Sequence, residues 1–135
     1  MKITVSTTIN APIEKVWSAW TTPEDICNWN AASDEWHTPN AINDLRVNGT
    51  FSYRMEAKDG SMGFDLNGTY SVVEHHERID HFFEDGREIT THFNSNGDTT
   101  EVTEAFDAET MNPVELQQQG WQAILDNFKR YVEEK

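Results

Sequence analysis

The side chains of this sequence that could transfer protons in a cleft are five histidines and one glutamate: His37, His75, His76, His81, His92 and Glu104. A general acid or base needs a pKa near the working pH and a position within reach of a substrate. Five histidines in 135 residues is an ordinary number, so their count indicates no site. His75 and His76 are adjacent near a predicted strand end, where successive side chains point to opposite faces, so we expect a structural or surface role and no metal site.

Glu104 is the most informative of the six. Its parity places it with Val102 and Phe106 on the inward face of a predicted strand. An unpaired carboxylate there would be costly, or its pKa would rise. In one interpretation Glu104 lies near a strand end, in contact with water or paired with an arginine such as Arg54. In the other it is a polar anchor for a ligand hydroxyl. The sequence favours the first.

Other reactive residues give few signs of an enzyme. Cys27 adjoins Ile26 and lies close to Trp29, which indicates a small buried residue rather than a nucleophile. Asp44 and Arg46 could pair and fix a loop, which is the favoured interpretation, or line a cavity mouth. The sequence contains no glycine-rich phosphate loop, serine nucleophile elbow or His-Glu-x-x-His helix. We expect no cofactor and name no catalytic residue; whether the chain is an enzyme stays open, with binding favoured.

The first third of the chain predicts one strand, two short helices and a loop. Residues 2–9 alternate apolar and polar, as in a half-buried strand. Pro12 suits the first turn of a short helix, and Thr22 can cap a second that has a proline in its first turn. From 30–48 the periodicity disappears, which predicts a long loop; it contains Trp36, which could close over a pocket.

The middle of the chain predicts an antiparallel meander with one apolar face. Asp59-Gly60, Asp85-Gly86 and Asn96-Gly97 supply the positive backbone angles of tight hairpins. A further turn is expected around Glu77-Arg78. The strands predicted between these turns cover approximately residues 51–55, 64–72, 79–84, 89–93 and 100–106.

The last element is predicted as a long amphipathic helix. Asn112 could cap it, with Pro113 in the first position and Glu115 three residues after the cap. Its apolar stripe consists of Trp121, Ile124, Leu125, Phe128 and Val132. Gly120 in mid-helix marks either a close approach of backbone or simply a weaker helix.

Together these elements predict one α+β domain over residues 1–135. A curved antiparallel sheet of about six or seven strands would grip the long C-terminal helix, with two short helices after the first strand. Because a curved sheet and a straight helix diverge towards one end, we expect a cavity between them.

Composition and charge limit the partners. The chain has 24 acidic and 10 basic residues, hence a formal charge of −14, which disfavours nucleic acid and anionic membranes. With 36% hydrophobic and 11% aromatic residues it can build a core. A single cysteine excludes an internal disulfide, and no apolar run suggests export or a membrane span, so we expect a cytoplasmic protein.

Several motifs, in order, resemble the START-like helix-grip superfamily (SRPBCC, polyketide cyclase/dehydrase-like). They are Ala11-Pro12-Ile13-Glu14-Lys15-Val16-Trp17, Thr22-Pro23 followed by Trp29, Asn43-Asp44-Leu45-Arg46-Val47-Asn48-Gly49-Thr50-Phe51, Gly68-Thr69-Tyr70 and Gly120-Trp121. More narrowly they resemble the branch named after the activator of the ninety-kilodalton heat-shock-protein ATPase. The likeness covers essentially the whole chain. One departure is Asn48, where this branch often has glycine.

The resemblance implies the helix-grip fold, while the choice of function depends on pocket chemistry. We expect the cavity to bind a small hydrophobic or aromatic ligand, lipid- or polyphenol-like. One alternative, implied by the branch name, is a co-chaperone-like partner of a heat-shock ATPase; another is an aromatase or cyclase acting on polyketide-like substrates. The expected ligand-binding residues are Trp36, Phe51, Tyr53, Phe64, Tyr70, Phe93, Glu104, Trp121, Leu125 and Phe128.

Overall fold

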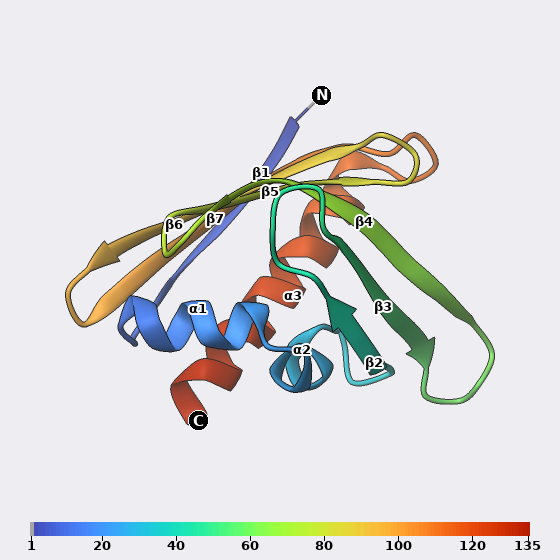
Figure 1. Ribbon diagram of the computed structural model, residues 1–135. Coiled ribbons are helices and arrows are strands. Elements are labelled where there is room, and N and C mark those ends of the chain that lie inside the picture. The colour runs from blue at the N-terminus through green and yellow to red at the C-terminus, as the bar shows by residue number, and fades with distance from the viewer. Residues whose placement is uncertain (1) are drawn as a thin grey trace.

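The computed structural model describes residues 2–135, which form an α+β helix-grip fold (Figure 1). Seven antiparallel strands make one sheet in the order β1-β7-β6-β5-β4-β3-β2. The elements are β1 (Lys2–Ile9), α1 (Ile13–Thr21), α2 (Pro23–Trp29), β2 (Trp36–Asn43), β3 (Thr50–Ala57), β4 (Gly63–Glu74), β5 (Arg78–Phe83), β6 (Glu88–Asn96), β7 (Thr99–Asp107) and α3 (Val114–Glu134). The predicted fold class is confirmed.

The sheet arches over the three helices (Figure 1). Strands β2 to β7 follow one another as a meander, and β1 returns to pair with β7, with Val5 opposite Glu104. The long helix α3 packs mainly against β1, at one end of this strand order. The helix therefore lies along one side of the arch and leaves the strands of the other side less covered.

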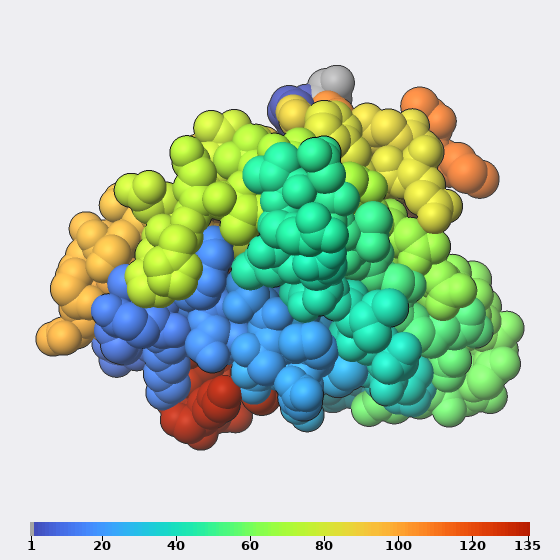
Figure 2. Space-filling view, viewed as in Figure 1, coloured from blue at the N-terminus to red at the C-terminus, as the bar shows by residue number. Residues whose placement is uncertain are grey.

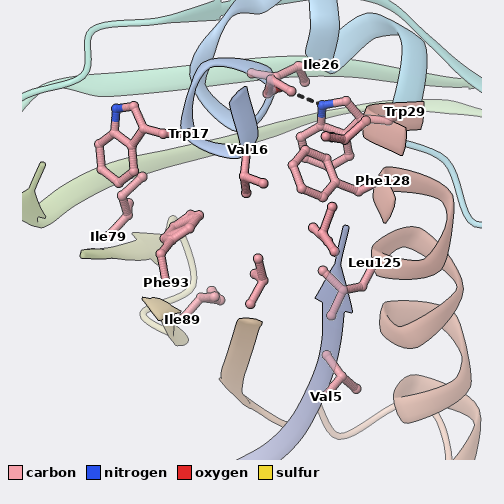
Figure 3. Packing of buried hydrophobic residues seen from close by; sticks show 14 of the residues in the cluster. Val5, Val16, Trp17, Ile26, Trp29, Ile79, Ile89, Phe93, Leu125 and Phe128 are labelled. Atoms are coloured by element: carbon pink, nitrogen blue, oxygen red, sulfur yellow. Dashed lines mark hydrogen bonds between the residues drawn. The ribbon is translucent and has the colours of Figure 1, made fainter. Parts of the chain in front are cut away.

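The core lies where the helices meet the sheet (Figure 3). Val16 of α1, Ile26 of α2 and Phe128 of α3 are fully buried there. The indole N–H of Trp29 donates a hydrogen bond of 2.8 Å to the Ala19 carbonyl, which ties the two short helices together. Burying side chains of this size stabilises the fold by about 2 kcal/mol each.

The predicted loop over 30–48 is wrong in part, because Trp36–Asn43 forms the edge strand β2. This strand pairs with β3, but its register shifts between His37 and Asn40. An irregularity of this kind interrupts the alternation of side chains, and Pro39 lies within it. The period-two signal that would have revealed the strand is therefore lost.

The expected opposite orientation of His75 and His76 is also wrong. Both lie in the turn between β4 and β5, and His76 has a positive φ of 64°. Their rings stack with centroids 3.8 Å apart, and both rings contact Trp17 edge-on. Opposite orientations require a regular strand, and these two histidines lie in a turn. Their contacts with Trp17 agree with the structural role that was expected.

The start of α3 differs from the predicted cap. Pro113 occupies the cap position without a side-chain hydrogen bond, so Asn112 does not cap the helix. Instead, Gln117 of the helix donates to the Asn112 carbonyl (2.8 Å) and accepts from the Glu109 N–H (2.9 Å). The side chain of Gln117 thus holds the preceding segment.

Asn48, where the related branch often has glycine, has a φ of 68°. Asparagine tolerates this left-handed conformation better than most residues with a side chain. The Asn48 N–H donates to the Tyr70 carbonyl (2.8 Å), and the Tyr70 N–H donates to the Gly49 carbonyl (2.9 Å). The turn therefore attaches the segment before β3 to β4.

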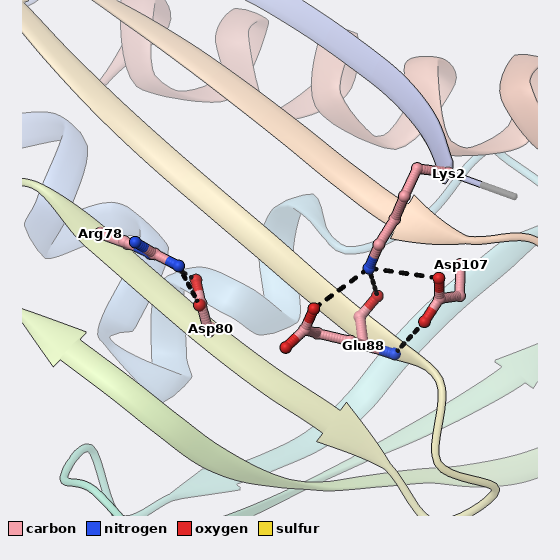
Figure 4. A network of polar contacts seen from close by, with 5 residues as sticks. All are labelled: Lys2, Arg78, Asp80, Glu88 and Asp107. Carbon is pink, nitrogen blue, oxygen red and sulfur yellow. Dashed lines mark hydrogen bonds and ion pairs between the residues drawn. The ribbon is translucent and has the colours of Figure 1, made fainter.

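Polar contacts cover the face of the sheet away from the helices (Figure 4). Lys2 lies 3.3 Å from a Glu88 carboxylate oxygen and 3.2 Å from one of Asp107, which links β1 with β6 and the end of β7. Arg78 pairs with the buried Asp80 at 2.6 Å. Ile79 and His81, the neighbours of Asp80 along β5, point to the helix-facing side of the sheet, so Asp80 points to the other side.

Candidate functional site

A cavity of about 310 Å³ lies between the sheet and the helices. Strands β3, β4 and β5 form most of one wall, with a single residue from β7, and the helices form the other. It is lined by Trp20, Thr21, Trp29 and Asn30; by Phe51, Tyr53, Met55, Phe64, Leu66 and Tyr70; by Ile79, His81, Phe83, Arg87 and Glu104; and by Trp121 and Ile124. The lining is mainly apolar and aromatic, as small-molecule sites are.

The cavity follows from the position of α3. Since this helix packs mainly against β1, it stands away from β3 and β4. Trp121 of α3 stacks on Phe106 of β7 at 3.9 Å, and this stack is part of the boundary between core and cavity. Helices α1 and α2 and the segment from β2 to β3 cover much of another face (Figure 2). Phe64 lines the cavity and is 45% exposed, so the cavity reaches solvent near this ring.

Gly68 gives room to the aromatic wall. A Cβ atom at this position would lie 2.5 Å from two atoms of the Phe51 ring. The glycine lets that ring lie over β4, where its centroid is 5.3 Å from Tyr70 and 4.9 Å from His81. The backbone of β4 thus fixes the ring cluster at this wall.

Glu104 is the one carboxyl group of the lining, and it is 6% exposed. Within residues 2–135 it forms no hydrogen bond and no ion pair. Burial raises the pKa of Glu104 to about 8. At neutral pH this carboxyl is therefore mostly protonated, and it can donate a hydrogen bond as well as accept one.

The interpretation that pairs Glu104 with Arg54 is wrong. Arg54 binds Glu56 (2.8 Å) and approaches Asp65 (3.5 Å). The reason is the pleat of β3: Arg54 lies between Tyr53 and Met55, which line the cavity, so its own side chain points to the opposite face. The alternative interpretation, a polar anchor in the cavity, agrees with the position of Glu104.

The remaining polar groups of the wall are neutral near pH 7. Burial lowers the pKa of His81 to about 4, and burial raises the pKa of Tyr53 and Tyr70. Arg87 is the one positively charged side chain in the lining formed by residues 2–135. Its guanidinium binds Asp85 at 2.8 Å and lies 5.0 Å above the Phe83 ring, so its charge is already compensated.

The sequence matches the family model described as Activator of Hsp90 ATPase homolog 1-like protein over residues 10–133. The chain belongs to this family. No protein with a curated functional description matches it. Membership in this family of activator homologue-like proteins confirms the branch indicated by the sequence motifs.

Solved structures agree with this assignment to the AHSA1-like family. The chain is 51% identical to the AHSA1-like protein from Aeromonas hydrophila, with a TM-score of 0.93 over 99% of this chain and 93% of that one. It is 52% identical to Chr148 from Cytophaga hutchinsonii, with a TM-score of 0.86 over 98% and 92%. Protein NE0264 from Nitrosomonas europaea shares the fold at 17% identity, with a TM-score of 0.84 over 99% and 95%.

The structure brings together six of the ten residues that the sequence of this AHSA1-like chain suggested for the ligand site. Those that line the cavity are Phe51, Tyr53, Phe64, Tyr70, Glu104 and Trp121. Phe93, Leu125 and Phe128 belong to the solid core instead. Trp36 begins β2 and packs near Phe64 at 6.1 Å without lining the cavity. That any of the ten contacts a ligand stays a prediction.

Sequence reasoning did not select several lining residues. Trp20 and Trp29 were not among the expected ligand-binding residues, and they stack with centroids 5.0 Å apart at the cavity wall. His81 was considered only as a titratable group. The alternation of Ile79, His81 and Phe83 along β5 was the available signal, because it places all three on the apolar face.

Other reactive groups lie outside the cavity. Asp44 and Arg46 form the expected ion pair, at 2.7 Å. Cys27 is half-buried, and burial raises the pKa of its thiol, which disfavours the nucleophilic thiolate. In residues 2–135 no three His, Cys, Asp or Glu side chains are grouped as metal ligands. No helix in the same range is long and apolar enough to cross a membrane.

Proposed function

We propose that this chain binds a small hydrophobic or aromatic molecule, lipid- or polyphenol-like, in the cavity between the sheet and α3. The observation that carries the proposal is the combination of about 310 Å³ of space, a mainly aromatic lining and one buried carboxyl without a protein partner. A protein interior rarely leaves a space of this size unfilled. Membership of the AHSA1-like family supports the fold that encloses the cavity, but the family description does not specify a ligand.

The dimensions set the size and affinity of the ligand. A cavity of about 150 Å³ accepts benzene, so twice that volume suits a bicyclic or tricyclic aromatic compound. A ligand of about 20 heavy atoms that gains ~0.3 kcal/mol per atom would bind with about 6 kcal/mol. The corresponding dissociation constant lies in the tens of micromolar.

Filling the cavity tests the proposal. Leu66→Trp places a large side chain into the lining, whereas Ile42→Trp adds the same side chain at a 60% exposed position of β2 outside that lining. The probe is N-phenyl-1-naphthylamine, a neutral aromatic dye whose fluorescence rises in apolar surroundings. We expect wild type and Ile42→Trp to bind it and Leu66→Trp to lose at least tenfold in affinity, with circular dichroism confirming that both variants fold. Equal binding by both variants would contradict a site in the cavity.

The two alternative functions stay predictions. A co-chaperone-like role predicts that the chain captures a heat-shock ATPase in a pull-down. A cyclase or aromatase role predicts turnover of a model poly-β-ketone that Glu104→Gln abolishes, because a carboxyl with a pKa of about 8 is suited to proton transfer near neutrality. Binding without turnover favours the first proposal.

A further inference from the structure

Two neighbouring polar groups of the inward face have no partner within residues 2–135. Glu104 of β7 lies directly opposite Thr91 of β6 in the register of the sheet. The Thr91 hydroxyl is buried and forms no hydrogen bond, and the Glu104 carboxyl forms none either. Adjacent unsatisfied groups of this kind are rare in proteins and call for an explanation. Of the two, only Glu104 lines the cavity, where a ligand group can supply the missing partner of its carboxyl.

Aromatic rings surround the space in front of this carboxyl. Trp20, Trp29, Phe51, Tyr53, Tyr70 and Trp121 contribute to the lining from both helices and sheet. The face of an aromatic ring carries partial negative charge and attracts a cation, most strongly in a desolvated site. Rings together with a carboxyl form a site with the chemistry of ammonium recognition.

Apart from Arg87, no positively charged side chain of the lining formed by residues 2–135 opposes a cation there. Opposite Glu104 on β1 stands Val5, and β6 presents Thr91. The wall supplies Tyr53, Tyr70 and His81, which are neutral near pH 7, and the helices supply only uncharged residues. Arg87 is the one basic side chain, and Asp85 already binds it.

The charge of the whole chain acts in the same direction. A formal charge of −14 raises the concentration of cations near the surface and lowers that of anions. A fatty acid or another carboxylate is therefore disfavoured, because it would have to approach this acidic surface and then lie beside Glu104.

We propose that the ligand of this cavity is an organic cation, a hydrophobic ammonium whose charged group binds against Glu104 while its apolar part contacts the surrounding rings. This inference rests on the proposed binding function and narrows its ligand class. An ammonium converts the buried carboxyl from a neutral acid into the carboxylate of an ion pair.

Proton release follows from this pairing. Because the buried Glu104 holds a proton below about pH 8, binding of a permanent cation expels it. The affinity for such a cation then rises with pH, by about tenfold per unit below pH 8 when only the carboxylate binds. His81 is neutral throughout pH 6 to 8 and leaves this dependence unchanged.

A matched pair of compounds tests the inference. Benzyltrimethylammonium and neopentylbenzene have the same shape and differ in one nitrogen and its charge. Binding to the full chain is measured by NMR shift titration at pH 6 and pH 8, in wild type, Glu104→Gln and Glu101→Gln. Glu101 lies on the same strand and is exposed, so its variant controls for the loss of one negative charge.

We expect wild type and Glu101→Gln to bind the cation at least tenfold more tightly than its isostere at pH 8, with a weaker preference at pH 6. Glu104→Gln should lose the preference. If the isostere binds as well as the cation, the cavity functions as a binding site but the cation inference is wrong. If neither compound binds wild type, the proposed function itself fails, and the inference with it.

A second measurement needs no variant. Calorimetry of the wild-type chain at pH 7, in two buffers of different ionisation enthalpy, counts the protons released on binding. We expect close to one proton for benzyltrimethylammonium and none for neopentylbenzene. Binding of the cation without proton release would overturn the role of Glu104.

Discussion

At the scale of single residues, Glu104 makes the stability of the fold depend on pH. Its pKa is raised from 4.5 to about 8 by burial. Between these values the unfolded chain loses the proton while the folded chain keeps it, so the folded state binds more protons. The free energy of unfolding therefore falls as pH rises through this window, by up to about 1.4 kcal/mol per unit from this group.

Glu104→Gln removes this term, since an amide has no proton to lose. We expect the variant to gain stability relative to wild type as pH rises from 5 to 8, by a few kcal/mol in all. Urea unfolding at each pH measures the difference. The matched variant Glu101→Gln, which changes an exposed position of the same strand, should keep a nearly constant difference from wild type. A flat difference for Glu104→Gln as well would show that the carboxyl is ionised in the folded chain at neutral pH.

His81 acts in the opposite direction. Burial lowers its pKa from 6.5 to about 4. From pH 6.5 down to 4 the unfolded chain takes up a proton that the folded chain does not, so this group reduces stability as pH falls. The two cavity residues partly cancel between pH 4.5 and 6.5, and only the comparison of variants with wild type separates them.

At the scale of elements, substitutions at two glycines with different surroundings separate the effect of side-chain packing from that of helix propensity. Gly68 of β4 has the Phe51 ring where a Cβ atom would lie, whereas Gly120 of α3 has nothing within 4 Å. Gly120 is therefore a weaker point of the helix and not a close approach of backbone. The same substitution has opposite predicted effects at the two positions.

Gly68→Ala should lower the free energy of unfolding by about 1–3 kcal/mol, because the ring must move in a packed wall. Gly120→Ala should raise it by about 0.5–1 kcal/mol through helix propensity. Chemical denaturation of both variants beside wild type measures the two shifts. A loss of stability in Gly120→Ala would mean that α3 lies closer to a neighbour than described.

The elements with regular periodicity were predictable from the sequence. The alternation in β1 and β3 to β7 and the apolar stripe of α3 specify the sheet and its helix, and these predictions are confirmed. β2 was missed because its irregular pairing breaks the alternation. The predicted cap at Asn112 is wrong because Pro113 occupies the cap position, and the side chain of Gln117 holds the segment before the helix.

For the site, the sequence could predict only which side chains point to the inward face of the sheet. Parity shows that Phe51, Tyr70 and Glu104 point inward, but parity cannot tell a cavity wall from a solid core. That distinction depends on where α3 lies along the arch, which places Phe93 and Phe128 in the core. It arises from packing between distant segments, which local patterns do not encode.

At the scale of the whole molecule, the core and the cavity share a wall. Phe51, Tyr70, Ile79 and Phe83 line the cavity and also belong to the buried core cluster. Changes at these residues therefore affect both stability and ligand choice.

We expect a ligand to occupy the space between the sheet and α3. Intermolecular NOEs between bound N-phenyl-1-naphthylamine and the methyl groups of the protein test it most directly. The cavity predicts contacts to Leu66 of β4 and Ile124 of α3, which both line it. NOEs confined to exposed methyl groups such as those of Ile42 and Val47 would contradict it.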